Sequence, residues 1–155
     1  MDQYFDIVQN LYDIGIRNFL FLNLPPTWRT PLHISDGSII QEELQQSVEI
    51  YNTQLHEKIG LFQRTYTVSR LINNIQSLYS FLTFISQDTR IYEFNTTAFF
   101  TKVLDDPLAY KFTSPVTTWC SNSTCFWKNL EHPSSWAHRF MAVEVAELLS
   151  QRGFW

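Results

Sequence analysis

Two short segments that predict β-strands, residues 18–22 and 90–94, constrain the fold of this 155-residue chain more than any other feature. The run from Asn18 to Leu22 is almost wholly apolar and is followed by a Pro-Pro pair, which is typical of a strand buried on both faces of a parallel sheet. Residues 90–94 (RIYEF) predict a second strand, which we expect in the same parallel sheet. Parallel strands need long crossover connections, so helices are expected between the two segments.

The intervening and flanking segments have helical periodicity. A first helix is predicted over residues 3–14. It should end at Gly15, because glycine readily adopts the left-handed backbone conformation that terminates a helix. Ser38 and Gln41 have the spacing of a capping box at the start of a long helix. The first helix should bury Tyr4, Ile7, Val8, Leu11 and Ile14, and the long helix Ile40, Leu44, Val48, Tyr51, Leu55, Ile59 and Phe62.

Two further helices are predicted after the second strand. A short one ends at the run Asp105-Asp106-Pro107, and a last one begins after Pro133, with Ser134 or Ser135 as its cap. A loop of roughly 25 residues separates them. The order helix, strand, helix, strand, helix indicates an α/β protein, but two parallel strands cannot complete a sheet that is covered on both faces. The predicted architecture is therefore part of a domain.

The charge balance argues against several classes of partner. Lys and Arg number 11 against 15 Asp and Glu, a formal net charge of −4, so we expect no nucleic acid and no anionic membrane partner. The longest charge-free run, residues 71–87, is interrupted by polar side chains and does not predict a transmembrane helix. The acidic start of the chain does not resemble a signal peptide, and none is expected in this chain.

Cys120 and Cys125 lie in a loop rich in Ser, Thr and Asn, and they are the two cysteines of the chain. A disulfide is the preferred interpretation, with two free thiols in a cytosolic fragment as the alternative. A zinc site with His132 is disfavoured because no fourth ligand has a second short spacing, so no metal is expected. Asn95 and Asn122 each begin a glycosylation sequon, which together with the cysteines indicates a secretory product.

His132 is the histidine with the most informative position. Pro133 favours an extended backbone at His132, directly before a helix N-terminus, and loops of this kind form the ligand-binding rim of an open α/β sheet. The positive helix end would disfavour an imidazolium, as a general base requires. A surface histidine that introduces a helix is the alternative. His33, His56 and His138 are expected to be solvated.

Three blocks of the chain carry a resemblance to a known family. Residues 12–26 (YDIGIRNFLFLNLPP), 103–107 (VLDDP) and 126–134 (FWKNLEHPS) resemble the C-terminal half of SGNH (GDSL-type) esterases, in the branch of fungal-type carbohydrate esterases that includes acetylesterases. The resemblance covers nearly the whole chain except about 20 residues in the middle, and the last block is the most specific. It implies that residues 1–155 are the C-terminal part of one hydrolase domain, a partial three-layer α/β/α, flavodoxin-like fold whose N-terminal half is absent.

The resemblance also assigns roles. In that family a GDS serine is the nucleophile, and a Gly and an Asn from two later blocks complete the oxyanion hole; none of these three blocks is present in this chain. The family's C-terminal block is Asp-x-x-His-Pro, which makes His132 the general base and places Asn129 where the orienting Asp is usual. The family's strand-end Asp corresponds to Asn95. The implied substrate is an ester, such as an acetylated carbohydrate, with no cofactor or metal, and the full-length parent is expected to be secreted.

Residues 68–87 interrupt the family pattern and are expected to be a non-family insertion. A retained in-frame intron is one explanation, because Val68-Ser69 can be encoded by the start of an intron and Gln87 by its end. A genuine surface insertion is the other. For the chain as a whole, the alternative to an esterase fragment is a non-catalytic remnant or interaction module that binds a partner through uncovered apolar surface.

Overall fold

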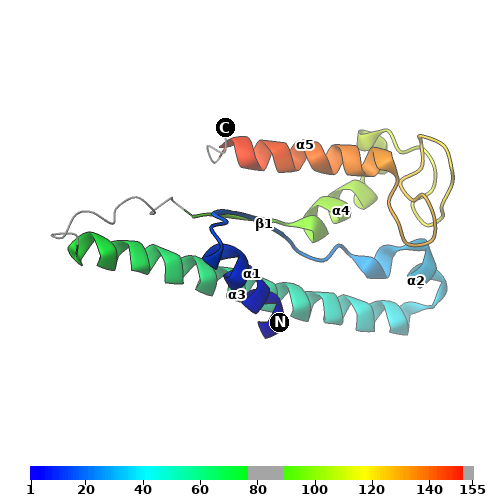
Figure 1. The fold of residues 1–155 in the computed structure, drawn as a ribbon. Helices are drawn as coiled ribbons and strands as arrows, with labels where there is room; N and C mark the ends of the chain where they lie inside the picture. The colour runs from blue at the N-terminus through cyan, green and yellow to red at the C-terminus, as the bar shows by residue number, and fades with distance from the viewer. Residues whose placement is uncertain (77–88, 152–155) are drawn as a thin grey trace. The chain divides into compact units, whose positions relative to one another are not determined.

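The computed structural model describes residues 1–76 and 89–151, with the backbone alone for residues 67–76. The predicted order of helices and strands is confirmed, and the structure adds two 3-10 helices and one short α-helix (Figure 1). The chain divides into two compact units, residues 1–21 with 53–93 and residues 22–52 with 94–155, which are described separately. The elements are α1 (Asp2–Asp13), β1 (Asn18–Leu22), η1 (Thr27–Arg29), α2 (Pro31–Ser35), α3 (Ser38–Gln76), β2 (Arg90–Phe94), α4 (Thr96–Asp105), η2 (Pro107–Tyr110) and α5 (Ser135–Gln151).

The strands β1 and β2 form a two-stranded parallel sheet. The Arg90 amide donates to the Arg17 carbonyl at 2.7 Å, where β2 begins. Burial alternates along β1, with Leu20 37% and Leu22 45% exposed. The prediction that β1 is buried on both faces is therefore wrong. The described residues cover one face of this strand, and an apolar run alone does not reveal which faces have a neighbour.

The buried face of β1 packs in the first unit against α1 and α3. Phe19 and Phe21 join Val8 of α1 and residues of α3 in one core cluster. The prediction of which residues of α1 are buried is wrong except at Val8. Ile7, for example, is 59% exposed. Aromatic packing sets the rotation of the helix, because the ring of Phe5 stacks on Phe21 with centroids 5.7 Å apart.

The helix α1 ends as the sequence predicts. Gly15 has a φ of +107°. The amide of Ile16 donates to the carbonyl of Leu11 at 3.0 Å, the six-to-one hydrogen bond of a glycine-terminated helix. A residue with a Cβ would be strained at this φ, so Gly15 is required by the backbone.

The long helix α3 buries much of the predicted stripe but begins differently. The buried positions are Val48, Leu55, Ile59 and Phe62, whereas Ile40 is 39% and Tyr51 36% exposed. Ser38 is already helical, and the Gln41 amide donates to the Gly37 carbonyl at 3.2 Å, so the predicted capping box is wrong. The helix continues through Gln76, and residues 77–87 of the predicted insertion lie outside the described residues.

The second unit is built on α4, α5 and the long loop between η2 and α5, which is confirmed as irregular. Helices α4 and α5 lie side by side in this unit (Figure 1), and Lys102 Nζ lies 3.0 Å from Glu144 Oε1. A hydrogen bond with Tyr110, together with this ion pair, raises the pKa of Lys102 well above its ordinary value. Their shared core contains Phe94, Phe99, Phe100, Val103, Leu104, Phe112, Phe126, Trp127 and Ala137.

A polar network in this unit lies directly after the carboxyl ends of β1 and β2. The side chain of Asn95, the N-cap of α4, accepts hydrogen bonds from the Ala98 amide at 2.9 Å and from Asn23 Nδ2 at 3.0 Å. Asn52 Nδ2 in turn donates to Thr97 Oγ1 at 3.0 Å. Asn95 thus ties the start of α4 to the segment that follows β1.

The N-cap of α4 gives a first prediction. Asn95→Ala should lower the free energy of unfolding by about 1 kcal/mol, because two donors lose their acceptor. Asn95→Asp keeps that acceptor and should stay within a few tenths of a kcal/mol of the parent. Urea denaturation of the three proteins measures the difference, and equal losses for both variants would contradict the role of this oxygen.

The disulfide between Cys120 and Cys125 gives a second prediction. It closes a short loop of sequence separation 5. Replacing both cysteines by serine should lower the free energy of unfolding by about 2 kcal/mol through the gain of chain entropy in the unfolded state. Thermal unfolding with and without reductant tests this, since reductant should affect the parent and leave the double variant unchanged.

Candidate functional site

The candidate site lies on the loop that precedes α5, where two short backbone segments pair. The amide of Lys128 donates to the carbonyl of His132 at 2.8 Å, and the amide of Ser134 donates to the carbonyl of Phe126 at 2.7 Å. These bonds close a tight loop with Asn129 near its tip. Of the two predicted caps for α5, Ser134 is confirmed: its Oγ accepts from the Ala137 amide at 3.3 Å.

The side-chain oxygen of Asn129 organises this loop. Asn129 Oδ1 accepts hydrogen bonds from the amides of Glu131 at 3.0 Å and His132 at 2.8 Å. It also lies 3.0 Å from His132 Nδ1. Two backbone donors identify this atom as the oxygen of the side-chain amide, and an amide oxygen can only accept. His132 Nδ1 must therefore carry a hydrogen in this contact, which leaves the lone pair of a neutral ring on Nε2.

Buried aromatic residues hold this loop in place. Phe126 and Trp127 are 0% and 2% exposed and belong to the core of the second unit. The indole of Trp127 also donates to the Val116 carbonyl at 2.6 Å. On the other side, the amide of Leu32 in α2 donates to the Leu130 carbonyl at 3.0 Å. The loop tip is thereby fixed from two directions.

The ring of His132 is exposed to solvent. Among the side chains of residues 1–66 and 89–151, no serine or threonine hydroxyl makes a hydrogen bond with this ring. The arrangement can thus present an oriented base at a surface.

A second histidine has a partner that sequence reasoning missed. His33 was expected to be solvated in a loop, but it lies in α2, and its Nδ1 is 2.8 Å from Asp36 Oδ2. A carboxylate on Nδ1 orients an imidazole in the same way as Asn129 orients His132. The spacing His-x-x-Asp in a short helix after Pro31 was the available signal. His56, on α3, pairs with Glu93 at 2.7 Å.

The two cysteines and the two sequons lie in the second unit, and one sequon falls inside the loop that the cysteines close. Cys120 and Cys125 form a disulfide, with their Cα atoms 5.6 Å apart. Asn122 is exposed within that loop, and its Oδ1 accepts from the Thr124 amide at 3.0 Å. Asn95 is also exposed and caps α4.

Neither a metal cluster nor a membrane span is found in the described part of the chain. No group of three or more His, Cys, Asp or Glu side chains there has the geometry to hold a metal ion. Among the described helices, none combines the length and the apolar character needed to cross a bilayer.

Comparison with known proteins relates the chain to an esterase. It is 31% identical over 153 residues to an acetylesterase from Thermothelomyces thermophilus. The match covers 95% of this chain and 42% of the acetylesterase, so the chain spans less than half the length of that relative. No family model matches the chain. The chain is thus related in sequence to an ester hydrolase over nearly all of its length.

Proposed function

We propose that residues 1–155 are the C-terminal part of an SGNH (GDSL-type) hydrolase domain that cleaves ester bonds, with an acetyl group on a carbohydrate as the substrate class. The observation that carries the proposal is the contact between His132 Nδ1 and Asn129 Oδ1. It falls in the block that most specifically resembles this family, in a chain related to an acetylesterase. The two-stranded parallel sheet is compatible with a partial α/β domain of this kind.

In the proposed mechanism His132 is the general base. Its Nε2 takes the proton of a serine hydroxyl, supplied from outside this chain, as the serine oxygen attacks the ester carbonyl. The same nitrogen then protonates the leaving alcohol, and a second round with water releases the acid. Asn129 positions the ring and fixes its tautomer, but a neutral amide does not offset the imidazolium charge as a carboxylate does.

The proposal extends to the location of the parent protein and to the middle of the chain. A disulfide between Cys120 and Cys125 and exposed sequons at Asn95 and Asn122 support a secreted, glycosylated parent. We further propose that residues 68–87 are an insertion into the domain. Transcripts that always include this stretch would favour a genuine insertion over a retained intron.

The mechanism gives a prediction for the base. In a longer protein that joins this chain to a block with a GDS serine, His132→Ala should lower kcat for an aryl acetate by roughly 10⁴-fold or more, because the serine loses its base. His138→Gln is the matched control, since His138 is exposed and its Nδ1 contacts the carbonyl of Ser134, the residue that caps its own helix. The 155-residue chain alone should release no acetate above the His132→Ala background, and turnover that depends on His132 would place a nucleophile within it.

The partner of the base gives a separate prediction. Asn129→Ala should lower kcat by roughly 10²-fold, because His132 loses the acceptor that orients its ring. Asn129→Asp should leave kcat unchanged or raise it, because a carboxylate both orients the ring and stabilises its charge. Steady-state kinetics of both variants in the longer protein measure this. A loss in Asn129→Asp as large as that in Asn129→Ala would contradict the positioning role.

A further inference from the structure

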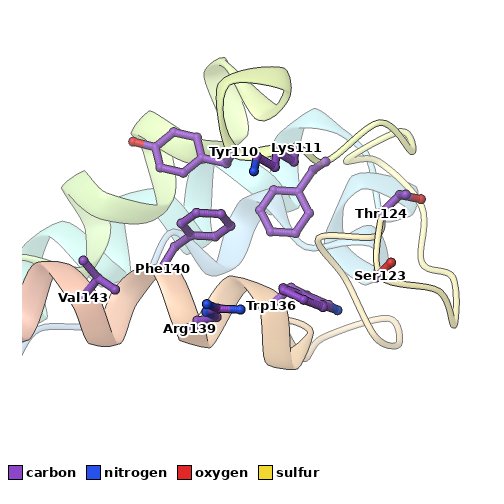
Figure 2. A pocket seen from close by; sticks show the side chains of 9 residues that line it. Tyr110, Lys111, Ser123, Thr124, Trp136, Arg139, Phe140 and Val143 are labelled. Carbon is purple, nitrogen blue, oxygen red and sulfur yellow. The ribbon is translucent and has the colours of Figure 1, made fainter.

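The second unit contains a cavity of about 550 Å³ that the proposed mechanism does not use. Figure 2 shows Trp136, Arg139 and Phe140 of α5 on one side of this cavity, with Tyr110 and Lys111 on the opposite side. A volume of this size is typical of a small-molecule site. Trp136 is 41% exposed, so the cavity is accessible from solvent.

The walls of the cavity are aromatic and fixed in position. Phe112 is 1% exposed, and its ring centroid lies 5.9 Å from that of Phe140. The ring of Phe140 also packs edge-on against Tyr110 at 5.4 Å. Rings held in this way offer a preformed apolar surface that suits a flat apolar ligand.

Two cations line the same cavity, and none of the described residues lining it is acidic. The guanidinium of Arg139 lies 5.5 Å from the centroid of the Trp136 ring, so an aromatic face holds it at the wall. Some other cations of the described structure do pair with carboxylates, as Arg29 does with Asp105 at 2.7 Å and Lys58 with Asp2 at 2.6 Å. Lys111 and Arg139 are both exposed, so this positive charge, which has no acidic partner among the residues lining the cavity, is accessible to an anion from solvent.

The backbone at Lys111 supports a specific placement of this charge. Lys111 has a φ of 64°, in the left-handed region, and is the one non-glycine residue with a positive φ in the described chain. This conformation costs about 1 kcal/mol for a residue with a Cβ. Glycine or asparagine would adopt this conformation at a lower cost. A lysine at this position therefore supports a role for its ammonium group.

We propose that this cavity binds a small aromatic carboxylate. The aromatic ring of the ligand packs among Trp136, Phe140 and Phe112, and its carboxylate accepts hydrogen bonds from Arg139 and Lys111. Arginine suits this role because its planar fork matches a carboxylate. The charge of the lining selects an anion although the whole chain carries a net charge of −4. This inference does not rest on the proposed esterase function.

Benzoate and benzamide are the probes that test the proposal. They have the same shape and differ in charge. Titrating the 155-residue chain with each compound, with the indole NMR resonance of Trp136 as the readout, therefore separates the contribution of charge to the affinity from that of shape. Benzoate should bind roughly tenfold more tightly than benzamide, as expected for charge-assisted hydrogen bonds. Lys111→Asn, which suits the left-handed backbone, and Arg139→Gln, which keeps helix propensity, should each lower the benzoate affinity and leave the benzamide affinity unchanged.

Lys128→Gln is the matched control, because it removes a cation from an exposed loop position outside the cavity. It should leave the benzoate affinity unchanged. The proposal is overturned if benzoate and benzamide bind alike, if neither shifts the Trp136 resonance, or if Lys128→Gln weakens benzoate as much as the two cavity variants do. Tighter binding of a neutral monosaccharide such as xylose would assign the cavity to carbohydrate and would likewise overturn it.

Discussion

The burial of Phe126 and Trp127 is the interaction on which the candidate site depends. The long loop before α5 lacks regular secondary structure, so the contacts of its side chains have to supply its rigidity. Two fully buried aromatic side chains anchor one end of the tight loop that holds Asn129, and the Trp127 indole bonds the Val116 carbonyl. A polar, exposed group such as His132 can then be held at a fixed place without being buried itself.

Much of the fold could be predicted because local patterns and backbone chemistry agree. The spacing of Leu55, Ile59 and Phe62 identifies the buried face of α3, and a glycine is the residue that tolerates the φ at Gly15. Which faces of β1 are buried could not be predicted. An apolar residue such as Leu20 fits a doubly buried strand as well as a strand with one open face, and the outcome depends on elements that are distant in sequence.

The candidate site was predictable in a different way. The position of His132 before Pro133 indicated a rim loop on physical grounds, but the pairing with Asn129 came from the resemblance to a family block. Spacing alone does not show which atom of a side chain faces which donor. The contact between His33 Nδ1 and Asp36 Oδ2 was missed for a similar reason, because the short helix α2 that brings them together was not predicted. The aromatic cavity beside α5 combines residues from three segments and has no local signal.

The tautomer of His132 tests the central claim most directly. Long-range ¹H–¹⁵N NMR spectra of the 155-residue chain, recorded at about pH 8.5 where an imidazole is neutral, report which ring nitrogen carries the hydrogen. The account predicts a hydrogen on Nδ1 and a lone pair on Nε2, with this preference lost in Asn129→Ala. A parent protein in which Nε2 carries the hydrogen, or an Asn129→Ala variant with an unchanged spectrum for His132, would contradict the proposal that Asn129 prepares this ring to act as a base.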